Sequence, residues 1–574
     1  MAIAKLSTEE NLTEEQLRDA IIQKDTELGS DYNERVGGVT NQMGNGKKIA
    51  GYKDLRNFFE GDHWSYIKED GTPTRVYNYC RTTVLNYTAF LANESPEDDV
   101  PPRDVTDEIE VARTTEVENI LREIKEDNEF PIVFSEAVQN QSLLGDCFIF
   151  GPYIEWVKVP GSKKKLPRVR FKNIKRVENV RPLWSDEDFT EMEGFILYHR
   201  ISVRKAEKVY SEQMKERGIR SLAATPPVNY QQPTGNPMCT VKIYWDEKYL
   251  LAMVEDRVID FKIHNWGFIP GIFVPNIRYP TRPWGVSDIE DILDSQVEYN
   301  EAVSATRGKI NQVAIPHIFY AGEEEPLDYQ AGQAQLIKLS PDARVFPDPM
   351  GQSTAPFDIY MGNRKSDIHQ LSMISEIFYG GAMTAKATGR ALSVLMQGVN
   401  NKVKLKEQYW KVALQKLNAN ILRLVEVYAP NAKMLIQGYY KTDIFFPSIL
   451  IRNVTEEINK FNMKLQSQYT TMKNLGIPAP KEEQKVMKRE WEDMDLAIEI
   501  SRNPGMRMEI QRIMREAAMS RGEQGPTKGP MLTEGEGGAG HEAEEELPMA
   551  APRTPTETSA TPEGAVELRA FRGK

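Results

Sequence analysis

The sequence predicts an α+β fold, and three observations lead to that prediction. Short apolar runs separated by Gly and Pro, as in β-strands, fill residues 147–274. Apolar residues at alternating steps of four and three, as on one face of a long helix, fill residues 390–430. After Arg521 the chain is rich in Gly, Pro, Glu, Ser and Thr, and we expect residues 521–574 to form a disordered acidic tail because they have too little apolar surface to bury.

Length and composition narrow the class of protein. A chain of 574 residues is too long for one core, and about 100–200 residues per domain predicts about three or four structural units. No apolar run approaches the ~20 residues that span a bilayer, so we expect no membrane association. The net charge of −12 argues against a protein that grips nucleic acid over its whole surface, although local contact with DNA remains allowed.

The first part of the chain is expected to mix helices with strands. Residues up to about 48 are polar, with one helix predicted over residues 14–28, and we expect this N-terminal arm to be peripheral. Two helices are expected to pack against a neighbouring sheet, and a third ends at Gly145; they cover residues 79–91, 111–125 and 134–144. Strands are expected over residues 147–154, 163–171, 194–198, 240–245, 250–254 and 268–274.

The middle of the chain predicts two helices around a small β unit. A helix is expected over residues 287–312, with Asp288 among the acidic residues near its start, where they complement the helix dipole. Pro316 ends it. Strand-like runs follow at residues 317–320 and 335–339, and a second helical pattern extends to Phe378.

A flexible loop and a long helix follow. Residues 379–389 contain three Gly, and the helix after them is expected to extend about 50 Å at 1.5 Å per residue before Pro430 ends it. Lys406 is the one polar residue on its apolar seam, which is formed by Leu392, Met396, Val399, Val403, Trp410, Ala413, Leu417, Ile421 and Leu424. Residues 433–451 are expected to return two strands to the first sheet. Helices are then expected over residues 456–475, 482–500 and 507–519.

Motifs for catalysis are incomplete, so we expect a protein that is not an enzyme and has no cofactor or metal. The segment Met43-Gly-Asn-Gly-Lys-Lys48 lacks the first Gly and the Ser or Thr of a phosphate-binding loop. The acidic residues 186–188, with Glu191 and Glu193, could hold a divalent cation, but a solvated acidic turn is the favoured interpretation. No His pair has metal-ligand spacing, and no Gly-x-Ser-x-Gly sequence is present.

Lysines in and after the flexible loop have two interpretations each. Lys386 is the only charged residue in the loop and is either a group that touches phosphates transiently or an ordinary surface lysine. Five lysines on the long helix are expected mainly on a solvated or intersubunit face, with a role in DNA contact as the alternative: Lys402, Lys404, Lys406, Lys411 and Lys416.

Several of these segments, in this order, resemble the portal proteins of tailed bacteriophages over about residues 54–519. The matching segments begin with Tyr77-Asn-Tyr-Cys-Arg81, continue with Leu144-Gly-Asp-Cys-Phe-Ile-Phe150, and include Tyr299, Asn300 and Ser304 ahead of Gly322. The strongest is Ile374-Ser-Glu-Ile-Phe378 followed by Thr388-Gly-Arg-Ala-Leu392, similar to the place where the tunnel loop of such portals meets a long helix.

The resemblance implies a portal-type fold with a mixed α/β wing, a helical stem, a small β-rich clip and a helical crown. By position, the parts are an N-terminal arm (1–50), wing (51–286), stem helix (287–312), clip (313–356), second stem helix (357–378), tunnel loop (379–389), long wing helix (390–430), wing strands (431–454), crown (455–520) and tail (521–574). It also implies a homo-oligomeric ring, typically of twelve subunits, at one capsid vertex of the virion, assembled in the host cytoplasm.

The implied site residues fall in three groups. The tunnel loop that lines the DNA channel would contain Tyr379, Gly380, Gly381, Ala382, Met383, Thr384, Lys386, Thr388 and Gly389. Basic residues facing the channel from the stem would be Arg307, Lys309, Arg364 and Lys365. In the clip, Glu323, Glu324 and Glu325 would contact partner proteins.

The implied partners are double-stranded DNA, the large terminase, a head-completion or adaptor protein, and the major capsid and scaffolding proteins. Two other functions stay open at this point: a DNA-processing enzyme of the packaging machinery, such as a terminase or nuclease, and a capsid or tail structural protein without a channel. The incomplete phosphate loop counts against the terminase, and the order of helix, β unit, helix, loop and long helix counts against the structural protein.

Overall fold

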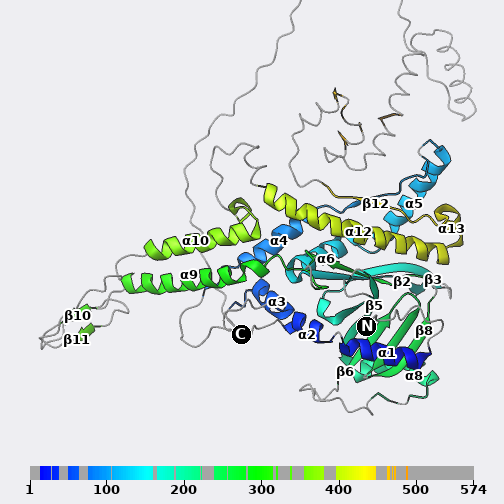
Figure 1. Ribbon diagram of the computed structural model, residues 1–574, viewed down its shortest axis with the longest axis horizontal. Coiled ribbons are helices and arrows are strands. Elements are labelled where there is room, and N and C mark those ends of the chain that lie inside the picture. Colours follow the sequence, from blue (N-terminus) through cyan, green and yellow to red (C-terminus); the bar gives the residue numbers. More distant parts are fainter. Residues whose placement is uncertain are drawn as a thin grey trace, which may run out of the picture. The chain divides into compact units, whose positions relative to one another are not determined.

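The computed structural model is a mixed α+β protein, as the sequence predicts (Figure 1). It describes residues 13–27, 29–37, 50–63, 75–104, 106–158, 165–185, 189, 191–219, 221–222, 238–254, 256–264, 266–278, 282–314, 318–320, 336–338, 355–379, 396–447, 462–463, 465, 468, 471–472 and 487–488. The chain divides into two compact units, Met1–Pro480 and Lys481–Lys574. All helices and strands named below belong to the first unit.

A five-stranded antiparallel sheet occupies the middle of the sequence. Its strand order is β4-β5-β6-β7-β8, formed by Val180–Trp184, Met192–Ser202, Met238–Trp245, Tyr249–Val254 and Arg257–Ile263. The strands β5, β6 and β7 contain three of the predicted runs, whereas β4 and β8 are missing from the prediction. Neither strand alternates buried and exposed residues regularly, so periodicity alone gives a weak signal. Two short helices, α7 (Val203–Val209) and α8 (Ser211–Glu216), pack at one end.

The N-terminal arm packs on this sheet and is not peripheral, so that prediction is wrong. Helix α1 (Glu14–Glu27) agrees with the predicted helix, and its Leu17 and Ile21 are fully buried in one cluster with sheet residues. A buried ion pair joins Lys24 to Glu193 of β5. Helix α2 (Gly29–Gly37) follows α1 and was not predicted. The polar sequence of the arm conceals its burial because the charged residues find partners on the sheet.

A second sheet has three strands in the order β3-β2-β9, formed by Lys165–Asn173, Asp146–Lys158 and Gly271–Pro275. The predicted run 147–154 lies within β2, and the runs predicted at 163–171 and 268–274 overlap β3 and β9. Helix α6 (Phe130–Leu144) leads into β2 through Gly145, whose φ of 84° suits glycine. The 3₁₀ turn η1 (Val177–Asn179) joins the two sheets along the chain.

Three further helices precede β2. Helices α4 (Tyr79–Ala92) and α5 (Glu108–Asp127) contain the predicted ranges, and α3 (Tyr52–Glu60) was not predicted. Helix α4 packs mainly on α6, so the prediction that it packs on a sheet is wrong. Helix α5 contacts strand β1 (Glu97–Asp99) as well as helices α12 (Gln397–Tyr428) and α13 (Pro430–Ile436). Asparagine and aspartate caps start two of these helices: Asn78 accepts from the Arg81 amide and Asp107 from the Ile109 amide.

The long helix α12 (Gln397–Tyr428) packs along α4, α6 and the three-stranded sheet (Figure 1). Its 32 residues span about 48 Å. Every predicted seam residue that the structure describes is buried, and Trp410, at the centre, donates to the Gln141 side chain over 2.7 Å. The predicted start at residue 390 lies outside the described residues. The apolar seam is therefore confirmed from Met396 to Leu424.

The chain after α12 differs from the prediction. Pro430 ends α12, but it also begins helix α13 (Pro430–Ile436), where its fixed φ and missing amide are tolerated at the first position. Two strands were expected over residues 433–451, of which 448–451 lie outside the described residues. The described part contains β12 (Asp443–Phe445), which pairs with β1 (Glu97–Asp99) in a separate two-stranded sheet and does not join the first sheet.

Helices α9 (Leu293–Ala314) and α10 (Ala355–Ser372) lie side by side and antiparallel (Figure 1). Between them along the chain, β10 (Ile318–Tyr320) and β11 (Leu336–Lys338) form a parallel pair, which confirms a small β unit between two helices. We call α9 and α10 the hairpin. Both predicted helix boundaries need correction: α9 begins after the 3₁₀ turn η2 (Glu290–Ile292), and α10 ends at Ser372, before the 3₁₀ turn η3 (Glu376–Tyr379).

Several predictions lie outside the described residues. They are the loop residues 380–389, the phosphate-loop-like residues 43–48, the acidic residues 186–188 and the tail over residues 521–574. The crown, 455–520, is described only at eight scattered residues, so its predicted helices are not described either.

Candidate functional site at the root of the hairpin

The hairpin joins the rest of the protein through two short segments, residues 285–292 before α9 and residues 372–379 after α10. We call these the hairpin root. Asp288 lies in the first segment and its side chain is fully buried. Its carboxylate accepts hydrogen bonds from Ser142 of α6 over 2.5 Å and from the Asn276 side chain over 3.1 Å. The predicted role of Asp288 as a helix-dipole partner is wrong, because α9 begins five residues later.

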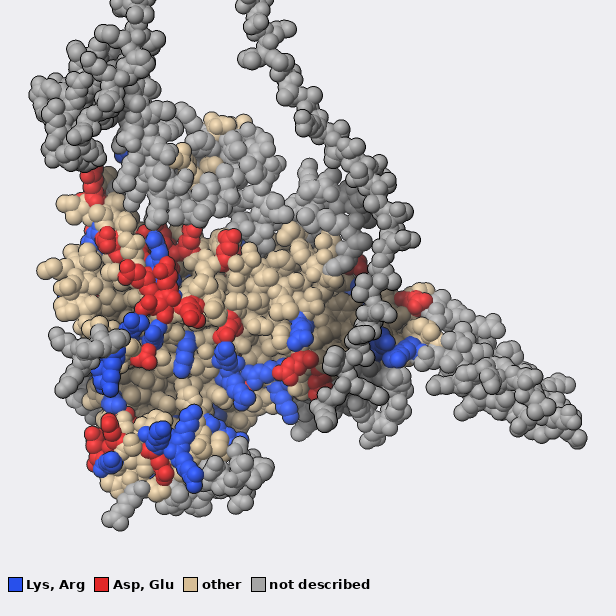
Figure 2. Space-filling model, turned by 180° about the vertical axis from the view of Figure 1, so that it is seen from behind, with Lys and Arg blue, Asp and Glu red and all other residues tan. Residues whose placement is uncertain are grey.

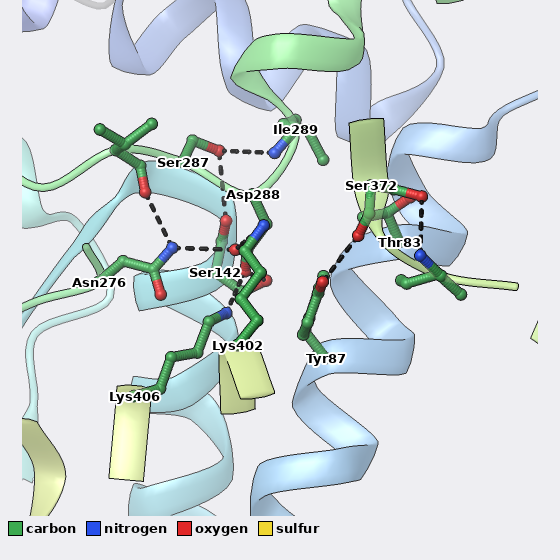
Figure 3. A network of polar contacts seen from close by, with 12 residues as sticks. Thr83, Tyr87, Ser142, Asn276, Ser287, Asp288, Ile289, Ser372, Lys402 and Lys406 are labelled. Atoms are coloured by element: carbon green, nitrogen blue, oxygen red, sulfur yellow. Dashed lines mark hydrogen bonds and ion pairs between the residues drawn. The ribbon is translucent and has the colours of Figure 1, made fainter. Parts of the chain in front are cut away.

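Two lysines of α12 complete the Asp288 cluster, which consists of Asp288, Lys402, Lys406, Ser142 and Asn276 (Figure 3). Lys406 forms an ion pair with one carboxylate oxygen, and Lys402, one helical turn earlier, approaches the other at 3.2 Å. Both ammonium groups are largely removed from solvent, so the predicted solvated face is wrong for these two lysines. Lys404, Lys411 and Lys416 are exposed, as predicted.

The charges in this cluster influence one another strongly. Burial disfavours the carboxylate, but Lys406 and Lys402 more than offset it and lower the pKa of Asp288 to about 2. Burial lowers the pKa of Lys406 to about 8, against the attraction of Asp288. One carboxylate therefore balances two cations in the interior. A buried pair of this kind specifies a geometry more than it adds stability.

A second buried charge, Asp146, fixes the same segment from the other side. It accepts from the Gly285 amide and from the Tyr52 hydroxyl, both over 2.7 Å, and Arg35 lies 3.6 Å away. A Cβ on Gly145 would lie 2.4 Å from the Gly285 carbonyl oxygen, and a Cβ on Gly285 would lie 2.2 Å from the Gly145 carbonyl oxygen. Only glycine at both positions allows this close approach.

The second part of the hairpin root is fixed by hydroxyl groups. Tyr87 of α4 donates to the carbonyl of Ser372, the last residue of α10, over 2.7 Å. The Tyr379 hydroxyl lies 2.7 Å from the Thr83 hydroxyl and donates to the Ser372 hydroxyl over 3.1 Å. Met373 turns the chain at a φ of 58°, which ends α10.

Tyr379 also packs in an aromatic cluster, so its predicted place in a flexible loop is wrong. Its ring lies 5.5 Å from that of Tyr79 and 4.6 Å from that of His369, and Tyr79 meets Tyr299 of α9 at 5.4 Å. These rings come from α4, α9, α10 and η3. Tyr379 is thus a fixed residue directly before the loop.

The basic residues predicted to face a channel have different surroundings. Arg307 is exposed on α9. Arg364 pairs with Glu298 at 2.9 Å and with Asp367 at 3.3 Å, and Lys365 pairs with Glu376. Lys309 lies in α9, but its side chain is outside the described residues, as are Glu323, Glu324 and Glu325. Two of the four cations are thus neutralised within the chain.

Charge on the surface is mixed. Figure 2 shows patches of Lys and Arg next to patches of Asp and Glu on the visible face, and no continuous basic tract among the residues it colours. Such a distribution agrees with the prediction that the protein does not grip nucleic acid over its whole surface.

Among the described residues, no group of three or more His, Cys, Asp or Glu side chains could hold a metal ion. An open groove of about 610 Å³ lies at the end of α12, and three of its polar side chains are engaged within the chain: Tyr440 donates to Glu426, and Arg423 donates to the Gly267 carbonyl. Of the helices that are described, none has the length and apolar character to cross a bilayer.

Comparison with known families identifies the relatives of this chain. Residues 76–495 match the family model described as "Phage portal protein, SPP1 Gp6-like". This chain belongs to the phage portal protein family. The matched region contains the hairpin, the Asp288 cluster and α12. A comparison with curated proteins found no match.

Family membership confirms the resemblance seen in the sequence and settles the broad class. Portal proteins are structural proteins and not enzymes. Membership implies a ring oligomer, passage of DNA and a place at a capsid vertex of the virion.

Sequence reasoning noticed Lys406 on the apolar seam but missed its partner. The two residues are 118 positions apart, and Asp288 stands among other acidic residues that are exposed or half-buried, such as Asp291 and Asp294. A lysine on an otherwise apolar face is the signal that could have prompted a search for a buried carboxylate. Nothing local to Asp288 distinguishes it.

Proposed function

We propose that this protein is the portal of a tailed bacteriophage capsid, a ring of about twelve subunits that conducts double-stranded DNA during packaging and ejection. The observation that carries the proposal is the antiparallel hairpin with its small β unit, joined to a long helix within the region that matches the portal family. A hairpin of two helices about 33 and 27 Å long, at 1.5 Å per residue, is a suitable wall element for a channel.

Each part of the chain corresponds, in this proposal, to one part of a portal subunit. Helices α9 and α10 form the stem, the β10–β11 unit belongs to the clip, the two sheets with α12 form the wing, and residues 455–520 form the crown. The clip, including Glu323, Glu324 and Glu325, binds the large terminase and later the head-completion adaptor. Major capsid and scaffolding proteins contact the ring during assembly in the host cytoplasm.

The charge balance of the hairpin supports a conduit. A wall that held phosphates strongly would stall DNA, since each Lys or Arg fixed on the backbone adds affinity by releasing counterions. In the hairpin helices, carboxylates at Asp294, Glu298, Glu301, Asp358 and Asp367 balance cations at Arg307, Lys309, Arg364 and Lys365. The wall therefore has little net charge.

Residues 380–389 are proposed to form the part of the tunnel loop that touches DNA, with Lys386 as its phosphate contact. Because Tyr379 is fixed in the aromatic cluster, the proposed loop begins one residue later than the sequence suggested. Deleting residues 380–388 should leave rings intact and reduce DNA packaging or retention. Loss of ring assembly in this variant would contradict the assignment.

The experiment that tests the function is the mass of the purified protein in solution, together with negative-stain images of the same fraction. Rings of about twelve copies with a central hole are expected. Assays for ATP hydrolysis and DNA cleavage on that fraction test the enzyme alternative, and closed particles without a hole would favour a structural protein without a channel.

A further inference from the structure

Tyr87 of α4 lies between the two halves of the hairpin root (Figure 3). Its hydroxyl group donates a hydrogen bond to the Ser372 carbonyl at the end of α10 over 2.7 Å. The face of its ring lies 4.1 Å from the Lys406 ammonium and 4.9 Å from that of Lys402. Its fractional exposure is 1%, so water does not compete for either contact.

We infer that Tyr87 couples the end of α10 to the Asp288 cluster, so that a change on one side alters the other. The end of α10 precedes the proposed tunnel loop, so the coupling would link that loop to the Asp288 cluster. This consequence for DNA passage rests on the proposed function. The coupling itself is a property of the folded chain.

The Asp288 cluster contains more positive than negative charge. Lys402 and Lys406 share the single carboxylate of Asp288, and both ammonium groups face the Tyr87 ring. The negative face of an aromatic ring attracts cations, and the attraction is stronger where water is excluded. The position of the ring therefore affects how well the two charges are accommodated.

The Ser372 carbonyl links Tyr87 to the end of α10. Carbonyls in the last turn of a helix lack partners within that helix, and here the Tyr87 hydroxyl satisfies one of them. The hydroxyl oxygen and the ring of Tyr87 lie in one rigid plane, which moves as a unit when either side-chain torsion rotates. A shift of the α10 end consequently moves the ring relative to the lysines or breaks the hydrogen bond.

The cluster is built so that it can respond to such a shift. Lys402 and Lys406 are one helical turn apart, and each contacts a different oxygen of Asp288. If one ion pair lengthens, the other still balances the carboxylate. The cluster can therefore adjust to a small movement without leaving Asp288 unpaired.

Hydrogen exchange measured by mass spectrometry on the assembled full-length protein tests the coupling. Asp288→Asn should speed exchange in residues 372–379, where the Ile374 and Phe378 amides are hydrogen-bonded, by about fivefold or more relative to the five-stranded sheet. In a Tyr87→Phe background, the same substitution should add less than twofold there, because the connecting hydroxyl is gone.

Reciprocity gives a second readout. Because coupling between two sites acts in both directions, Tyr87→Phe alone should speed exchange in residues 285–292, where the Asp288 and Ile289 amides are hydrogen-bonded. An equal effect of Asp288→Asn in both backgrounds, or no change in residues 285–292, would overturn the inference.

A matched control is Tyr244→Phe. Tyr244 is also fully buried, and its hydroxyl donates to the Asp246 carboxylate over 2.9 Å in the five-stranded sheet. This variant should leave both root segments unchanged. If Tyr87→Phe does not fold, Tyr379→Phe provides a second variant, since it removes the other hydroxyl that binds Ser372; Asp288→Asn should then still act on residues 372–379 through Tyr87.

Exchange is measured without DNA or packaging proteins, and ring formation is followed separately by mass. A protein that forms no conduit could therefore still show the coupling, and a portal could lack it. The two failures are distinguishable.

Discussion

Asp288, Lys402 and Lys406 are the residues at which a single change should have the largest effect. Their charges lie in the interior and are stabilised by one another, by a few polar groups around them and by the Tyr87 ring. Removing one member of a buried pair costs more than the pair contributes, because the remaining charge has neither water nor partner.

We expect substitutions of these three residues to lower the free energy of unfolding by different amounts. Asp288→Asn leaves two buried ammonium groups without a counter-charge and should lower the free energy of unfolding by roughly 3–5 kcal/mol. Lys406→Met should cost roughly 1–3 kcal/mol, since Lys402 still balances Asp288. Lys402→Met should cost least, because its side chain retains 12% exposure. Chemical denaturation at fixed protein concentration measures all three.

The exposed Lys411→Met on the same helix is the control and should change the free energy of unfolding by less than about 0.5 kcal/mol. If Lys406→Met cost as much as Asp288→Asn while Lys402→Met cost nothing measurable, Lys402 would not share the carboxylate.

Asp146 predicts a pH dependence. Burial raises its pKa to about 6, above its ordinary 3.8, although Arg35 and two hydrogen bonds oppose the rise. Between pH 4 and 6 the folded state therefore holds this proton more tightly than the unfolded state, so stability falls as pH rises through that window, by about 3 kcal/mol from this group. Denaturation at a series of pH values should show the fall.

Asp146→Asn should remove that part of the profile, whatever its effect at a single pH. The Asn side-chain oxygen can still accept from the Gly285 amide, so the backbone contact is retained. Identical profiles for the two proteins between pH 4 and 6 would show that Asp146 ionises normally.

At the scale of elements, α12 organises the largest core. It contributes more than any other helix to a cluster that includes α4, α6 and the three-stranded sheet, and its side chains Val403, Trp410 and Leu417 have no exposure. The opposite side of the same helix shows apolar residues to solvent, such as Val412 at 53%.

This asymmetry gives a matched pair of substitutions. Val403→Asp and Leu417→Asp should each prevent folding or ring formation, because an unpaired buried charge costs several kcal/mol. Val412→Asp changes the same residue type on an exposed position and should be tolerated by the fold. Soluble yield and thermal denaturation compare the three. Full-size, normally stable rings of Val403→Asp would refute the core assignment.

The two helices of the hairpin have different boundaries in the structure from those that the sequence predicts. The acidic residues before α9 are typical of a helix start, but the backbone there makes tertiary hydrogen bonds: the Asp288 amide donates to the Ser142 carbonyl over 3.0 Å. At the other end, Ser372 has ordinary helix neighbours along the sequence, and only the turn at Met373 ends α10. Both boundaries follow from the packing of the hairpin root and not from local propensity.

At the scale of the whole molecule, we expect the residues after Arg521 to be dispensable for ring assembly. The family match ends at residue 495, and residues after Arg521 have almost no bulky apolar side chain until Leu568. Truncation after Arg521 should therefore leave the number of subunits in the ring unchanged, as measured by mass photometry or native mass spectrometry. A monomeric product would show that the tail takes part in assembly.

Much of the fold could be predicted because its signals are local. Period-four-and-three apolar residues gave α12, apolar runs bounded by Gly gave β2 and β9, and the order of helix, β unit and helix gave the hairpin. The arm was misjudged because Lys24 and Asp25 look like surface residues until Glu193, Arg181 and Lys242 are placed beside them.

The sequence by itself determined the α+β class, the long helix and the resemblance to portal proteins, since these depend on residue periodicity and on motif order along the chain. Only the tertiary structure decided that Asp288 pairs with two lysines 114 and 118 residues away, that Tyr379 is fixed, and that Tyr87 joins the two. The physical reason is that apolar periodicity reports which face of an element is buried. The partner of a buried charge is selected by geometry between elements, which a single chain of residues does not encode locally.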